Sequence, residues 1–105
     1  MAFKVLFMAH SPDADPDKHN WILETDMYKL FVVFVKNQNQ AIEISKKLAE
    51  DENIDSILLC PGFTHKDVAE IVDATGGKVA VSVARGDGPS SRISAEARKR
   101  EGWMR

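Results

Sequence analysis

The segment from Ile57 to Val68 constrains the fold more than any other part of the chain. It begins with an apolar run over residues 57–60, which has the length and composition of a buried strand. Pro61-Gly62 then turns the chain, and Thr64 to Asp67 has the spacing of a helix capping box, with Asp in place of the usual Glu or Gln. We therefore expect a strand, a sharp turn and the start of a helix in direct succession.

The same alternation of strand and helix patterns recurs along the rest of the chain. Residues 28–35 are continuously apolar, β-branched and aromatic, which is typical of a central strand covered on both faces. Residues 41–50 have the spacing of an amphipathic helix, and Asn37 or Asn39 can cap it. The helix after Thr64 is expected to end at Gly76-Gly77. In a strand over residues 78–84, valines share one face and small residues the other, which indicates close approach of a helix or another chain. A last helix, capped by Ser91 or Ser94, runs through Arg100.

This order of patterns predicts one α/β domain over residues 1–105. Its sheet would be open, with four to five mostly parallel strands in two or three layers and helices covering its faces. Residues 3–8 supply another strand, also expected to be buried on both faces. Residues 11–26 fit a loop, one helical turn at Asp15-Pro16, or a hairpin with its tip at Asp26-Met27. If this region is helical and the strands alternate in direction, an α+β ferredoxin-like sandwich is the alternative.

Composition and charge narrow the class of protein. The chain has a net charge of -2, so no basic surplus points to a nucleic-acid partner. No apolar segment has the length of a membrane span or the pattern of a secretory signal, which favours a soluble cytoplasmic protein. Residues 92–105 hold five basic and two acidic side chains, a balance of +3. Residues 90–105 are therefore a candidate docking helix for an acidic face of the same protein or a partner subunit, or else a solvated tail.

Polar residues concentrate in the loops that follow three of the predicted strands. If those strands are parallel, their carboxyl ends share one edge of the sheet, where such folds bind ligands. The helix start after Gly62 offers unpaired N–H groups and Arg85 a fixed positive charge, so we expect a small anionic ligand. The candidate ligand-binding residues are His10, Gly62, Phe63, Thr64, His65, Arg85 and Asp87.

Two other classes of function stay open. Cys60 lies near a helix start, so an enzyme could use Cys60, His65 or His10 on a small metabolite, although an inert core cysteine is the plainer interpretation. We expect the ligand-binding protein to be a homo-oligomer, with Trp21 and Trp103 as candidate subunit contacts. A purely structural subunit of a homo-oligomer is the other alternative, in which the small-residue strand over residues 78–84 and the tail build the interface.

Neither a metal nor a nucleotide has motif support. The chain lacks the glycine-rich motifs that bind dinucleotides and nucleoside triphosphates. The loop after the first strand carries imidazole and carboxylate groups that could bind a divalent metal, but a solvated acidic loop fits their spacing better. Those groups belong to His10, Asp13, Asp15 and His19.

Several motifs taken together resemble a family of small prokaryotic α/β proteins known only as a domain of unknown function. The resemblance covers residues 3 to about 90, and the basic tail after Pro89 departs from it. It implies no activity, but it places the recognisable residues on the loops selected above. The motifs are Asp15-Pro16 followed by His19, Glu24-Thr25-Asp26, Cys60-x-Gly62-Phe63-x-His65, Val68-Ala69-Glu70-Ile71, Gly77-Lys78-Val79 and Arg85-x-Asp87-Gly88.

Overall fold

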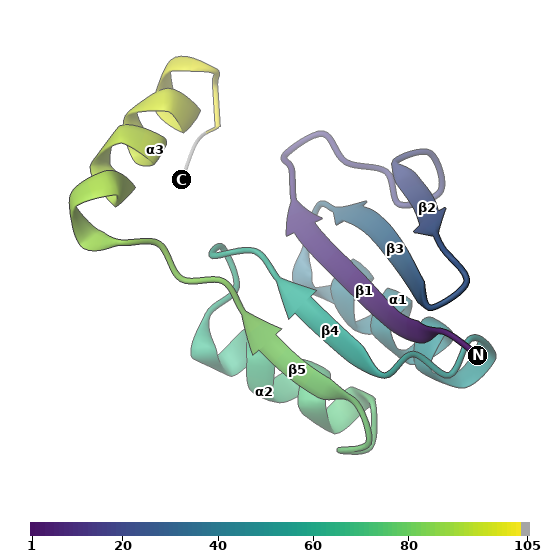
Figure 1. Cartoon of the computed structure of the whole chain (residues 1–105). Helices are drawn as coiled ribbons and strands as arrows, with labels where there is room; N and C mark the ends of the chain where they lie inside the picture. Colours follow the sequence, from purple (N-terminus) through teal and green to yellow (C-terminus); the bar gives the residue numbers. More distant parts are fainter. Residues whose placement is uncertain (104–105) are drawn as a thin grey trace.

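The structure is a computed structural model that describes residues 1–103, and it has a mixed, mostly parallel five-stranded sheet with three helices (Figure 1). The strand order is β2-β3-β1-β4-β5, and only β2 runs antiparallel to its neighbour. The predicted small α/β fold is therefore confirmed. In chain order the elements are β1 (Phe3–His10), β2 (Asn20–Glu24), β3 (Tyr28–Val35), α1 (Gln38–Asp51), β4 (Ser56–Leu59), α2 (His65–Ala74), β5 (Ala80–Val83) and α3 (Gly88–Arg100).

The region that fitted a loop, a helical turn or a hairpin combines all three. The carbonyl of Asp15 accepts hydrogen bonds from the N–H groups of Lys18 and His19, which makes one helical turn. The chain then enters β2, which forms a hairpin with β3. At its tip the Thr25 hydroxyl accepts hydrogen bonds from two backbone N–H groups. The ferredoxin-like alternative is wrong, because it requires a helix where this edge strand lies.

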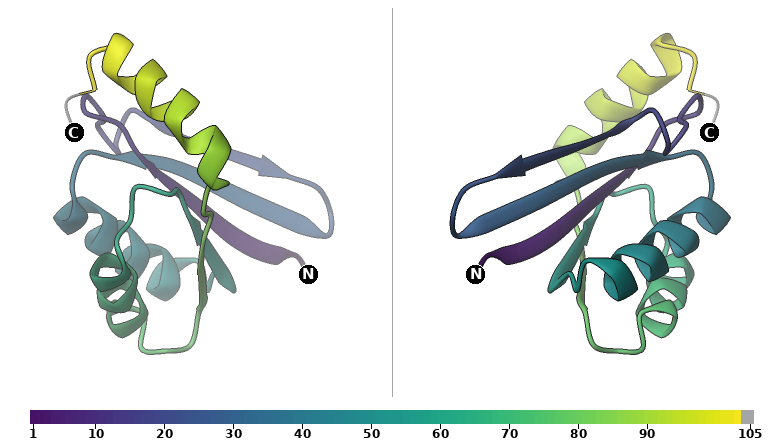
Figure 2. Two further views of the ribbon diagram at one scale, coloured as in Figure 1. Left: turned by 90° about the vertical axis from the view of Figure 1, so that its left-hand side faces the viewer. Right: turned by 90° about the vertical axis from the view of Figure 1, so that its right-hand side faces the viewer.

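Both α1 and α2 lie on one face of the sheet, as the edge-on views in Figure 2 make plain. Of the two or three layers that the sequence allowed, the structure has the two-layer arrangement, because α1 and α2 share one face and α3 stands apart from the sheet (Figure 1). The expectation that the strands over residues 3–8 and 28–35 are buried on both faces is wrong. Apart from Val5, their buried residues lie on the face covered by the helices, and side chains such as Phe34 are exposed on the other. The covered face holds the core, which includes Leu6, Met8, Phe31, Val33, Val35, Ile57, Leu59, Phe63 and Ile71.

Local signals set most of the helix ends. Asn37 caps α1 by accepting a hydrogen bond from the N–H of Gln40 at 2.9 Å. The predicted capping box opens α2, and Gly76 and Gly77, with φ of 71° and 70°, follow its end in the left-handed conformation that glycine favours.

The predicted start of the last helix is wrong. Helix α3 begins at Gly88 with Asp87 at the N-cap position, ahead of the predicted caps Ser91 and Ser94. Pro89 explains the earlier start, because its fixed φ suits the first turn of a helix. Ser91 lies inside the helix, where its hydroxyl donates to the carbonyl of Asp87. As predicted, the helix is followed by Gly102, which has a φ of 86°.

Helix α3 stands apart from the body of the domain, beyond the carboxyl ends of β4 and β5 (Figure 1). It buries none of its own residues. Its ion pairs within the described chain are local, joining Arg92 to Glu96 and Arg100 to Glu101. The docking helix or solvated tail over residues 90–105 stays a prediction. No helix among residues 1–103 is long and apolar enough to cross a membrane.

Candidate functional site

The turn between β4 and α2 is the centre of the candidate site. A side-chain carbon added at Gly62 would lie 3.1 Å from Nδ1 of His10, so the turn approaches the end of β1 as closely as a glycine allows. The imidazole of His10 stacks on the ring of Phe63, with 4.1 Å between ring centroids and 28° between planes. Phe63 is fully buried, so it anchors both the turn and the histidine in the core.

Cys60 and His10 form a second contact across the same two strand ends. The thiol sulfur of Cys60 lies 3.9 Å from Nδ1 of His10 and accepts a hydrogen bond from the backbone N–H of His10 at 3.4 Å. The sequence suggested His65 as a base near this thiol, but His65 is the first residue of α2 and is exposed. The imidazole beside the thiol is that of His10.

Arg85 and Thr64 hold the turn in place. The guanidinium of Arg85 donates to the carbonyl of Phe63 at 3.1 Å. The backbone N–H of Thr64 donates to the carboxylate of Asp67 at 2.9 Å, and the Thr64 hydroxyl accepts from the N–H of Asp67. The N-terminus of α2, where the sequence suggested an anion, thus already carries a carboxylate of its own chain.

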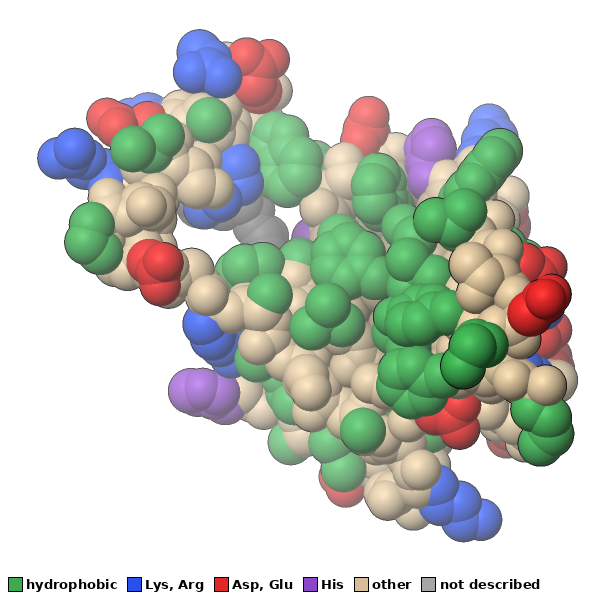
Figure 3. All heavy atoms as spheres, in the orientation of Figure 1, with side chains coloured by type: hydrophobic (Ala, Val, Ile, Leu, Met, Phe, Trp, Pro, Cys, Tyr) green, Lys and Arg blue, Asp and Glu red, His purple; other side chains and the backbone are tan. Residues whose placement is uncertain are grey.

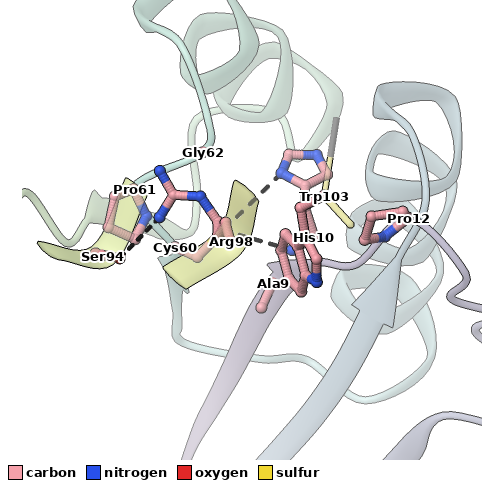
Figure 4. Close-up of a pocket in the computed structure, with 9 residues that line it drawn as sticks. All are labelled: Ala9, His10, Pro12, Cys60, Pro61, Gly62, Ser94, Arg98 and Trp103. Carbon is pink, nitrogen blue, oxygen red and sulfur yellow. Dashed lines mark hydrogen bonds between the residues drawn. The ribbon is translucent and has the colours of Figure 1, made fainter. Parts of the chain in front are cut away.

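A cavity of about 460 Å³ lies between this turn and α3. Figure 4 shows its residues coming from three directions: the end of β1, the turn after β4, and α3 with the residues that follow it. The wall formed by α3 brings in Arg98, which donates to the hydroxyl of Ser94 at 2.8 Å, and Trp103 lies beside His10. The lining residues are Ala9, His10, Pro12, Cys60, Pro61, Gly62, Ser94, Arg98 and Trp103.

The structure brings together part of the predicted ligand set. His10, Gly62, Phe63 and Arg85 are joined by the contacts above, with Thr64 next to them, while His65 and Asp87 make none of these contacts. Of the seven predicted residues only His10 and Gly62 line the cavity. Sequence reasoning missed Ser94, Arg98 and Trp103 as site residues. Two signals pointed to this segment. The uneven charge of residues 92–105 was interpreted as a docking surface, and Trp103 was interpreted as a subunit contact.

The acidic loop after β1 uses its polar groups to hold its own shape. The Ser11 hydroxyl donates to Asp13 at 2.6 Å, and this hydrogen bond is the main reason why the pKa of Asp13 is below its usual value. Nδ1 of His19 accepts from the N–H of Asp15 at 2.9 Å. Among residues 1–103 no group of three or more His, Cys, Asp or Glu side chains is arranged to hold a metal ion.

Comparison with protein families gives one result. Residues 3–98 match the model of a family described as a "Family of unknown function (DUF6506)". Comparisons with curated proteins and with solved structures found no significant match. The match covers the sheet, the turn after β4 and the part of α3 that reaches Arg98.

Proposed function

The chain belongs to this family of unknown function, and we propose that it binds a small anionic ligand in the cavity between the Cys60–Gly62 turn and α3. The observation that carries the proposal is the guanidinium of Arg98, which lines the cavity (Figure 4). Among the described residues no carboxylate lies within ion-pair distance of it, and one hydroxyl, that of Ser94, accepts from it. A guanidinium has five N–H donors, so most of its donors are available to a carboxylate or a phosphate.

The size and lining of the cavity suit a metabolite. Its volume of about 460 Å³ falls in the range of small-molecule sites. Such sites combine an apolar lining with a few polar groups that fix orientation. Here Ala9, Pro12, Pro61 and Trp103 supply the apolar part. His10, Ser94 and Arg98 supply the polar part.

The proposal divides the seven residues selected from the sequence into two groups. His10 and Gly62 contact the ligand, because they line the cavity. Phe63, Thr64 and Arg85 hold the turn that carries Gly62. His65 and Asp87 have no part in it, and Arg98 takes over the charge recognition that the sequence had suggested for Arg85.

The substitution Arg98→Gln tests the proposal. It removes the charge and keeps much of the side chain, so the affinity for an anion should fall by about 10- to 100-fold, since a hydrogen bond to a charged group contributes roughly 1.5–3 kcal/mol. The measurement is a thermal-shift screen with inorganic phosphate, citrate and acetate, followed by calorimetry on any compound that raises the melting temperature. Arg92→Gln is the matched control, because Arg92 lies on the same helix but pairs with Glu96 and does not line the cavity. The proposal fails if no anion binds, or if both variants bind an anion as the unmodified chain does.

A second candidate function is catalysis by Cys60, and the contact with His10 favours it. In this role His10 would take the thiol proton and the thiolate would add to a carbonyl carbon of a ligand bound in the cavity, so that the carbonyl π bond opens and its electron pair moves to the oxygen. The neighbouring imidazole predicts that Cys60 of the native protein reacts with iodoacetamide at neutral pH, and that His10→Ala slows the reaction several-fold. Mass spectrometry of the alkylated chain measures both rates. A thiol that reacts only after unfolding would exclude this function.

The cytoplasm as the compartment and a homo-oligomer as the working form stay predictions of the sequence. So does the expectation that the partners include no nucleic acid and no membrane.

A further inference from the structure

The face of the sheet opposite α1 and α2 has no covering layer within the described chain. We call it the open face. Figure 3 looks onto it and shows hydrophobic side chains gathered over the strands. The strand register assigns residues to this face, because paired residues on neighbouring strands point to the same side. The open face consists of Phe3, Val5, Phe7 and Ala9 of β1, Trp21 and Leu23 of β2, Tyr28, Leu30, Val32 and Phe34 of β3, Ser56 and Leu58 of β4, and Ala80 and Ser82 of β5.

The composition of the open face is that of an interior. It includes no charged side chain, and its polar side-chain groups are two serine hydroxyls, one tyrosine hydroxyl and the indole N–H of Trp21. Trp21 and Leu23 are nevertheless 73% and 65% exposed. When one face of a sheet is in contact with water, that face normally carries polar and charged side chains, which alternate along each strand with the apolar side chains of the covered face. Contiguous apolar surface of this kind, without charge at its centre, is typical of the buried part of a protein interface.

The total surface area is larger than that of a compact protein of this mass. The chain exposes 7228 Å², whereas a folded monomer of 11.7 kDa is expected to expose about 5,900 Å². The excess of about 1,300 Å² includes the surface of α3, which buries no residue, and exposed side chains of the open face such as Trp21 and Leu23 are also part of the uncovered surface. A stable interface removes about 800 Å² from each partner.

We propose that the open face is the interface of a homodimer, in which the open faces of two copies pack against each other as the two layers of a β-sandwich. A second copy is the occupant that fits best because the face is apolar and uncharged, so two copies can bury it against each other without burying a charge. Two sheets pack face to face about 10 Å apart, and a twofold axis places the same residues on both sides. The small side chains of Ala80 and Ser82 allow the second sheet to approach β5. The open face has no basic side chain with which a nucleic acid or an acidic protein could pair.

This surface adjoins the ligand cavity at Ala9, which belongs to both, but the other cavity residues lie at or beyond the carboxyl ends of the strands and outside the open face. The dimer and the anion site can therefore fail independently.

Sedimentation equilibrium of the full chain tests the proposal. The unmodified protein should be a dimer at micromolar concentration. Leu23→Glu and Leu58→Glu should each raise the dissociation constant by about 100-fold or more, since each places two charges in the interface of a dimer. Both side chains are exposed in the single chain, so the variants should keep the fold, which circular dichroism checks. Ile93→Glu is the matched control, because Ile93 is equally apolar and 64% exposed but lies on α3. This variant should remain a dimer.

Tryptophan fluorescence gives a second readout that needs no charge on the face. The chain has two tryptophans, so Trp103→Phe leaves Trp21 as the reporter of the open face. In the dimer its emission should be that of a buried indole and should move to longer wavelength on dilution. The proposal is overturned if the unmodified chain is a monomer at high concentration. It is also overturned if an oligomer forms in which Trp21 stays accessible to iodide, or which only Ile93→Glu dissociates.

Discussion

Phe63→Ala is expected to lower the free energy of unfolding by about 3–5 kcal/mol, the usual cost of emptying a fully buried phenylalanine site. Phe63 is completely buried in the core cluster. The imidazole of His10 stacks on the ring of Phe63, and the carbonyl of Phe63 accepts the hydrogen bond from Arg85. The loss should lower the melting temperature by more than about 10 °C in a domain of this size. Urea denaturation at one fixed protein concentration measures it.

Phe63→Leu separates the cavity left by the ring from the stacking interaction with His10. Leucine fills most of the space, so the cost should stay below about 1.5 kcal/mol. The imidazole of His10 loses its stacking partner all the same, and its NMR signals should shift in this variant. Equal losses for the two substitutions would contradict the role of Phe63 as a packed core residue. An unchanged His10 spectrum would contradict the stacking.

Local signals in the sequence were sufficient to predict most of the elements and several of their ends, although β2 was left open and the start of α3 was wrong. The capping box at Thr64, Asn37 as the cap of α1 and the glycine pair after α2 all act within a few residues, and the structure has each of them. The class of fold followed from the alternation of strands and helices along the chain.

What covers each face of the sheet depends on contacts far apart in the sequence. An apolar, β-branched run such as that of β3 has the same composition whether its second face is covered by its own helices or by another chain. The run was therefore interpreted as buried on both faces, whereas in the structure the helices cover only one face of β3 (Figure 2). The small residues Ala80 and Ser82 of β5 lie on the uncovered face, so the close approach of another layer that they indicated stays a prediction.

The part of the candidate site that lies at the ends of parallel strands was predictable from the sequence. Once β1, β4 and β5 are parallel, His10, Gly62 and Arg85 must come to the same edge. The sequence did not show that Arg85 is bound to a backbone carbonyl or that Asp67 occupies the start of α2. Nor did it place Arg98 at the cavity, because that depends on where α3 lies after a loop.

A chain that ends after Gly86 is expected to lose the anion site and keep its stability. Because α3 buries none of its residues, removing it should change the free energy of unfolding by less than about 1 kcal/mol. The same truncation removes Ser94, Arg98 and Trp103, one complete wall of the cavity. Any anion that binds the full chain should therefore show no measurable binding to residues 1–86 in calorimetry.

Urea denaturation and calorimetry on both chains, at equal protomer concentration, distinguish the possible roles of α3. Equal concentration is needed because a dimer is stabilised by mass action. A loss of several kcal/mol would mean that α3 contributes to the core, in conflict with its exposure. Unchanged binding would place the anion elsewhere, and Arg98 would then be a surface residue. Retained stability with lost binding is the result that follows from the structure, because α3 buries none of its residues and its segment contributes Ser94, Arg98 and Trp103 to the cavity.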